Sequence, residues 1–170
     1  MFSTNFKSHL ILNVIVKMED GKVVSDITIR YRIYKIQEKY EPLVVHFDNV
    51  NDSIINRRIL YPEGICIIED SKCQREEIEI GGLKSSRYKF EIPDELLKYK
   101  YLTIESQMKE NGFDHWTTFN WTSLTPYDGL SCTIICQDNL VIKKKTLFDN
   151  KNKYIFTESD DKRRLDICST

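Results

Sequence analysis

Hydrophobic and polar residues alternate along much of this chain with a period of two, the pattern of β-strands that bury one face. One such stretch covers residues 9–16 and a second covers 23–36, with the turn-forming pair Asp20-Gly21 between them. A two-residue turn there pairs residues whose numbers sum to 41, and the apolar faces of the two stretches then match. The predicted pairs are Val14 with Ile27, Leu12 with Ile29 and Leu10 with Tyr31.

A second hairpin is predicted around Asn111-Gly112, a dipeptide that strongly favours a type I′ turn. Residues 116–129 follow it and hold both tryptophans and a dense run of Thr and aromatic residues, all of which favour strands. On the apolar face, the predicted pairs are Ile104 with Phe119 and Leu102 with Trp121. On the polar face, the large or amide-bearing side chains are Tyr101, Trp116 and Asn120.

Further short strands are indicated by apolar runs that end at turn residues. They cover residues 43–47, 64–68, 76–80, 87–92, 130–136, 140–144, 154–157 and 165–168, while residues 54–60 are ambiguous. A proline followed by two acids and two leucines predicts one short helix near residues 94–98. The fold class is therefore mainly β, as a single domain over residues 1–170. An antiparallel β-sandwich and a partly closed β-barrel both fit this pattern. Either the last strand lies at a sheet edge or the chain is a fragment of a larger protein.

Composition adds little that is specific. The 170 residues are 41% hydrophobic and 30% charged, with a net charge of −1, so no overall charge directs the chain to nucleic acid or anionic lipid. The five cysteines have irregular spacing, which favours reduced, mostly buried thiols in a cytosolic protein. No zinc pattern, signal peptide or membrane-spanning run is present, so we expect no metal, no cofactor and no direct membrane span.

Catalytic motifs are also absent from the sequence. It contains no nucleophile elbow, phosphate-binding loop, dinucleotide fingerprint or calcium loop. The three histidines are scattered, and the paired acids lie at turns or strand starts, where solvated carboxylates are expected. The sequence therefore predicts a protein that is not an enzyme.

One combination of residues does point to binding. Aromatic side chains stack on nucleotide bases and basic side chains neutralise phosphates, so a nucleotide site needs both kinds of group together. The commoner reading is that strand aromatics belong to the core and that lysines on an edge strand prevent aggregation. The candidate ligand-binding residues are Trp116, Tyr101, Asn120, Tyr127, Arg30, Arg32, Lys143 and Lys145.

Several short motifs in the last third of the chain carry a family resemblance. They are Trp-Thr-Thr-Phe at 116–119, Thr-Pro-Tyr-Asp-Gly-Leu at 125–130, Asp-Asn-Leu-Val-Ile-Lys at 138–143, Phe-Asp at 148–149 before Tyr154, and Asp-Lys-Arg-Arg-Leu-Asp-Ile at 161–167. Together this stretch resembles the β-strand-rich cytosolic sensor domain of bacterial membrane-anchored cyclic-nucleotide antiphage effectors. The resemblance implies a cytoplasmic sensor for a cyclic nucleotide or dinucleotide, the soluble part of a membrane-anchored protein.

A different class of function fits the same residues. A β domain can bind a protein partner, or a second copy of itself, through edge strands or an exposed aromatic patch. We therefore expect a non-enzymatic ligand-sensing domain, with a protein-interaction module or a structural β domain as the alternative.

Overall fold

Two β-sheets make up most of the part of the chain that the computed structural model describes, which is residues 5–35, 38–47, 52–69, 72–80, 83–117, 127–143 and 154–169. The strands are β1 (Asn5–Glu19), β2 (Lys22–Lys35), β3 (Leu43–Phe47), β4 (Ser53–Tyr61), β5 (Gly64–Ile67), β6 (Cys73–Ile80), β7 (Leu83–Phe90), β8 (Tyr101–Asn111), β9 (Tyr127–Cys136), β10 (Tyr154–Glu158) and β11 (Arg164–Ser169). The mainly β class is confirmed. The predicted short helix is also present, as the 3-10 helix η2 (Asp94–Leu96).

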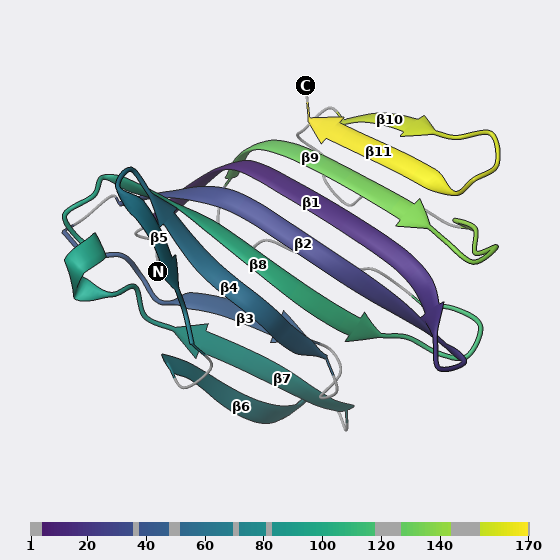
Figure 1. Ribbon diagram of the computed structural model, residues 1–170, viewed down its shortest axis with the longest axis horizontal. Helices are drawn as coiled ribbons and strands as arrows, with labels where there is room; N and C mark the ends of the chain where they lie inside the picture. Colours follow the sequence, from purple (N-terminus) through teal and green to yellow (C-terminus); the bar gives the residue numbers. More distant parts are fainter. Residues whose placement is uncertain are drawn as a thin grey trace.

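The larger sheet has eight strands in the order β10-β11-β9-β1-β2-β8-β4-β5, and the smaller sheet has the order β3-β7-β6 (Figure 1). In Figure 1 the small sheet lies towards the β4 side of the large one. The described strands leave β10 and β5 as separate edges, so the large sheet is open and not closed into a barrel. It is also mixed rather than antiparallel throughout, because β1 and β9 run parallel.

The first predicted hairpin is confirmed in its turn and in two of its three pairs. Asp20 and Gly21 both have positive φ, as a type I′ turn requires, and Val14 and Leu12 face Ile27 and Ile29. The third pair, Leu10 with Tyr31, is wrong. A β-bulge shifts the register between Ser8 and Ile11, and His9 within it adopts a φ of 53°. The residues before the bulge therefore face the opposite side of the sheet from the one that simple alternation predicts.

The predicted hairpin across Asn111-Gly112 is also wrong. Its first strand exists as β8, but Ile104 already lies between Tyr31 of β2 and Ile59 of β4, which leaves no lateral position for a further strand. Phe119 and Trp121, its expected partners, lie outside the described residues. Neither Asn111 nor Gly112 has positive φ.

Gly112 is required for close approach instead of for a turn. A Cβ at this position would lie 2.6 Å from the Cβ of Thr117 and 2.8 Å from the Val23 carbonyl oxygen. The Gly112 N–H donates to that same carbonyl, so the chain continues along β2 after β8 ends. The dipeptide that signalled a hairpin therefore serves a tight contact between two strands.

The C-terminal strands divide between confirmed and corrected predictions. The β10–β11 hairpin forms with the expected pairing, but β11 lies between β10 and β9, so β10 is the edge. The predicted partner strand at residues 140–144 is wrong for its described residues, 140–143. Asp138 and Asn139 do form a turn with positive φ, but both edges of β9 are already taken by β1 and β11.

One buried hydrophobic cluster joins the two sheets. We call the face of the large sheet that carries Ile29, Tyr31 and Ile33 the inner face, and the opposite face the outer face. Alternate residues of β1, β2 and β8 fill the inner face, as the sequence pattern predicts. The small sheet packs against it, and its buried residues include Leu43, Phe47, Tyr88 and Phe90.

Candidate functional site

Three aromatic rings lie side by side on the outer face at one end of the large sheet. Phe6 of β1, Tyr34 of β2 and Tyr101 of β8 are cross-strand neighbours in this order. The ring centroids of Phe6 and Tyr34 are 6.2 Å apart, and those of Tyr34 and Tyr101 are 5.9 Å apart. Phe6 and Tyr101 remain 37% and 39% exposed, so this row of rings is an exposed apolar surface.

Arg32 completes the row, and we call Phe6, Arg32, Tyr34 and Tyr101 the aromatic–arginine patch. The guanidinium carbon of Arg32 lies 4.8 Å from the centroid of the Tyr101 ring, within the range of a cation–π interaction. Its Nη1 donates a hydrogen bond of 3.4 Å to the Tyr34 hydroxyl. Hydrogen bonding from Arg32, followed by that of the Ser8 hydroxyl, lowers the pKa of Tyr34.

Arg30 follows the patch along the same face of β2, two residues from Arg32, and its side chain is exposed. It lies opposite Glu105 of β8, but that carboxylate is already bound from the other side by Arg58 of β4. The Arg58 Nε donates to Glu105 Oε1 at 2.7 Å, and Nη2 also contacts this oxygen. Among the described residues neither Arg30 nor Arg32 forms an ion pair, so two positive charges remain uncompensated beside exposed rings.

Trp116 does not join this patch. It follows the last residue of β8, whereas Tyr101 is the first, and 11 strand residues at about 3.4 Å each separate the two by roughly 35 Å. Trp116 stacks instead on Phe113, with ring centroids 4.2 Å apart and both side chains more than half exposed. The two aromatics that the sequence placed in one site therefore lie at opposite ends of β8.

The remaining candidates divide in the same way. Lys143 is exposed and follows Ile142, whose N–H donates to the Lys162 carbonyl near the C-terminal end of β9, far from the patch. Tyr127 begins β9 and pairs along the backbone with Lys7, next to the patch. Asn120 and Lys145 lie outside the described residues. The structure thus brings Arg30, Arg32 and Tyr101 together and separates them from Trp116 and Lys143.

No protein-family model and no curated protein matches this chain. Among solved structures, Legionella pneumophila aminopeptidase A in complex with aspartic acid is similar at 11% identity and a TM-score of 0.49, covering 99% of this chain and 20% of that one. Yeast LTA4 hydrolase in complex with bestatin is similar at 13% identity and a TM-score of 0.44, covering 96% of this chain and 28% of that one. A putative nutrient-binding protein from Legionella pneumophila is similar at 7% identity and a TM-score of 0.37, covering 98% of this chain and 68% of that one. The chain thus spans less than a third of either enzyme. At these scores the likeness carries no argument.

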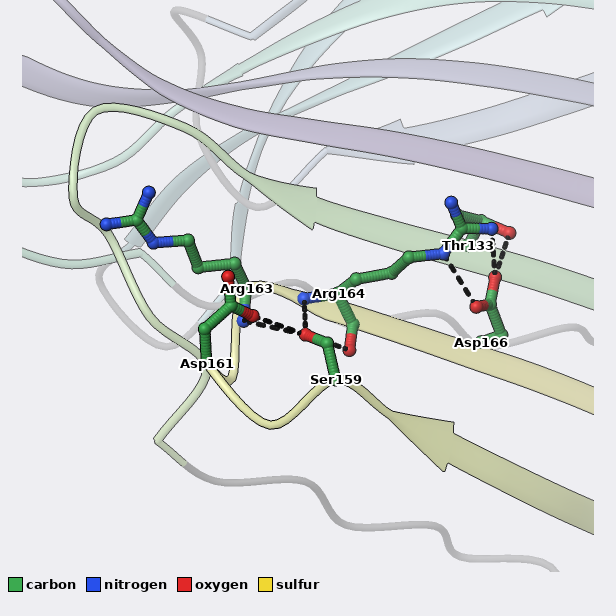
Figure 2. A network of polar contacts seen from close by, with 6 residues as sticks. All are labelled: Thr133, Ser159, Asp161, Arg163, Arg164 and Asp166. Atoms are coloured by element: carbon green, nitrogen blue, oxygen red, sulfur yellow. Dashed lines mark hydrogen bonds and ion pairs between the residues drawn. The ribbon is translucent and has the colours of Figure 1, made fainter.

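A second polar cluster lies at the far edge of the large sheet, where β10 turns into β11 (Figure 2). The Ser159 hydroxyl accepts hydrogen bonds from the backbone N–H groups of Arg163 and Arg164 and donates to Asp161. Asp166 accepts from Arg164 Nε at 2.8 Å and from the Thr133 hydroxyl at 2.7 Å. These groups therefore bind one another and fix the hairpin onto β9.

The pKa shifts in this cluster have the same origin. The Ser159 hydroxyl bond is the largest cause of the lowered pKa of Asp161. The Arg164 hydrogen bond, followed by that of Thr133, lowers the pKa of Asp166. Both carboxylates are therefore held in their ionised form by donors of the hairpin and of the adjacent strand β9.

In the described ranges none of the cysteines forms a disulfide. Cys132 and Cys136 are buried on the inner face of β9, and burial raises the pKa of Cys132 to about 11. Cys66 and Cys73 are half-buried and Cys168 is exposed, so the expectation of mostly buried thiols holds for two of the five.

In the described ranges no three His, Cys, Asp or Glu side chains are grouped so that they could hold a metal ion. Nor does any helix there have the length and apolar character needed to cross a membrane.

Two members of the patch escaped the sequence analysis. Tyr34 lies two residues after Arg32 on β2, so continued alternation would have placed it on the same face as Arg30 and Arg32. Phe6 could not be found in this way. Simple alternation puts Phe6 on the same face as the buried Leu10 and Leu12, and only the bulge at His9 turns it outward.

Proposed function

We propose that this chain is a non-enzymatic binding module that recognises another protein through the outer face of its large sheet. The observation that supports this most is the pair of arginines, Arg30 and Arg32, without an ion-pair partner among the described residues and beside the exposed rings of Phe6 and Tyr101. Arginine and tyrosine are enriched where proteins meet, because each combines a large contact area with a polar group.

The composition of the face favours a macromolecular partner. Exposed apolar side chains continue from the patch along β1 to Ile11 and Ile15, which are 39% and 37% exposed. An apolar strip of this length, interleaved with charge, exceeds the reach of one small ligand and is typical of an interaction surface. The partner would present carboxylates to Arg30 and Arg32 and apolar groups to the neighbouring side chains.

A charge-reversal experiment tests this proposal. The double variant Arg30→Glu/Arg32→Glu is compared with Lys22→Glu/Lys84→Glu, which makes the same charge change at exposed positions away from the patch. Wild type and control, used as bait in a lysate of the native cell, should retain the same partner under chemical cross-linking. The Arg30/Arg32 variant should lose it while keeping the wild-type melting temperature.

The outcomes separate the alternatives. If both double variants retain the partner equally, the outer face of the large sheet is not the binding surface. If the retained partner is a second copy of this chain, the interaction is self-association, and sedimentation should show the same dependence on Arg30 and Arg32. A strict monomer that retains no partner would overturn the proposal.

A cyclic nucleotide or dinucleotide is the second candidate ligand, favoured by the contact between Arg32 and Tyr101. A base could stack on the Tyr101 ring in place of the guanidinium, while Arg30 and Arg32 move to the phosphates. The antiphage sensing role implied by the family resemblance depends on this second candidate. Trp116 takes no part in it, because it lies at the other end of β8.

The nucleotide candidate has its own test. A calorimetry and thermal-shift panel of linear and cyclic mono-, di- and trinucleotides should show binding that Tyr101→Ala weakens about 5- to 100-fold, the range expected for loss of one stacked base. Trp116→Ala, an aromatic truncation at the other end of β8, should leave that binding unchanged. No binding at near-millimolar concentration, or equal sensitivity to both variants, would rule out this candidate.

A further inference from the structure

Two basic side chains of the large sheet lie on its inner face. The bulge at His9 reverses the alternation of β1, so that Lys7 shares the face of Ile33. On β4, Arg57 pairs with Ser106 and shares the inner face with the buried Ile59. A bulge can re-aim a single side chain, and the one in β1 brings the cation of Lys7 inward.

Arg57 is enclosed by both sheets. It is 2% exposed, and its guanidinium carbon lies 3.9 Å from the centroid of the Phe90 ring of β7. Its Nε donates to the Ser106 hydroxyl at 2.9 Å. Nη1 is buried without a hydrogen-bond acceptor among the described residues. Nε is thus satisfied, while Nη1 has no acceptor in the part of the chain that the structure describes.

Lys7 places a second positive charge on the same face. Its ammonium group lies 5.1 Å from the centroid of the ring of Tyr31, a buried inner-face residue. Burial raises the pKa of Tyr31, and the positive charge of Arg57 acts in the opposite direction. Burial lowers the pKa of both Lys7 and Arg57. Neither takes part in an ion pair among the described residues. The buried carboxylate of Asp52 accepts hydrogen bonds from Asn111, at the other end of β8.

Such an arrangement is costly without an anion. A buried charge that lacks a counter-charge and a full set of hydrogen bonds destabilises the folded state by several kcal/mol. We propose that the guanidinium of Arg57, between the sheets and near Tyr31, binds an oxyanion group, either a carboxylate or a phosphate. A guanidinium N–H forms a directional, charge-assisted hydrogen bond to an oxygen of such a group, which a spherical halide matches less well. This site is on the inner face and does not depend on the proposed protein-binding surface.

The test uses the intact chain and three salts. Melting temperature is measured in chloride alone and then with sodium phosphate or sodium acetate added at constant ionic strength. A ligand at ten times its dissociation constant should raise the melting temperature of a protein of this size by about 3–6 °C. A saturable rise with phosphate alone identifies a phosphate site, and one with acetate identifies a carboxylate site.

Variants show whether Arg57 is responsible. Arg57→Met should abolish the rise, whereas Arg58→Met, the same change at the next residue on the outer face, should keep it. If Arg57→Met does not fold, Ser106→Ala provides the test, because it removes the hydroxyl that positions Nε of Arg57, and it should weaken anion binding at least fivefold. The proposal is overturned if neither oxyanion exceeds chloride, or if Arg57→Met keeps the full response.

Discussion

Arg57 and Arg58 are consecutive residues of β4, and they lie on opposite faces of the large sheet. Arg58 reaches Glu105 on the outer face with its own side chain 41% exposed, so water screens both the cost and the benefit of the pair. Arg57 is 2% exposed, stacks on Phe90 and has one hydrogen bond. The same residue type is therefore a surface ion pair on one face and a buried, incompletely paired charge on the other.

The two faces differ in the same way as a whole. The inner face is mostly aliphatic and closed by the small sheet, so stability should reside there. The outer face mixes rings, aliphatics and arginines at intermediate exposure, so recognition should reside there. Substitutions that are matched in chemistry but placed on opposite faces test this division.

The largest effect is expected from matched aromatic truncations. Phe90→Ala removes a ring that is 1% exposed and contacts Arg57, and it should lower the free energy of unfolding by about 3–5 kcal/mol. Phe6→Ala removes the same atoms from the outer face and should lower it by less than about 1.5 kcal/mol. Urea denaturation measures both. Similar losses would mean that the outer face is covered.

A smaller effect is expected from the two arginines. In anion-free buffer, Arg57→Met should leave the free energy of unfolding within about 1 kcal/mol of wild type or above it, because an apolar group replaces an incompletely paired charge. Arg58→Met should lower it by less than about 1 kcal/mol, since its pair with Glu105 is partly exposed. A loss of 3–5 kcal/mol for Arg57→Met would contradict this and indicate a strong internal partner.

The smallest effect concerns an outer-face ion pair and its pH dependence. The pKa of Asp166 is lowered by Arg164 and then by Thr133. Its contribution is therefore present above the unfolded pKa of about 3.9 and is lost as the pH falls through the lower folded value. Asp166→Asn should lower the melting temperature by less than about 2 °C at pH 7, and this difference should disappear near pH 2. A difference that persists at pH 2 would assign the effect to packing.

Alternation along the chain predicted which residues of β1, β2 and β7 are buried, because each strand has one face on the core. It also predicted the turns at Asp20-Gly21 and Asp138-Asn139, whose backbone needs positive φ. Neighbours in the sheet were less predictable. The parallel β1–β9 pair joins segments more than 100 residues apart in the sequence, and no local pattern predicts that pairing.

The candidate site shows the same limit. Arg30, Arg32 and Tyr101 were found because β2 and β8 alternate without interruption. Trp116 was misplaced because the assumed hairpin at Asn111-Gly112 would have folded it back beside β8. Phe6 was missed because of the bulge at His9. Arg57 follows the alternation of the buried Ile59, and it was missed because the pattern of residues 54–60 was ambiguous. A bulge adds one residue and reverses every side chain beyond it, while leaving no reliable mark in the sequence.

The most direct test of the proposed protein-binding face is site-specific photocross-linking in the native cell. A benzophenone side chain replaces Tyr101 in the patch or, as the control, Lys84 of β7 on the small sheet. The account predicts a discrete adduct with one protein partner from position 101, none from position 84, and loss of the adduct when Arg30 and Arg32 are changed to Glu. Adducts of equal yield from both positions, or none from position 101, would contradict it.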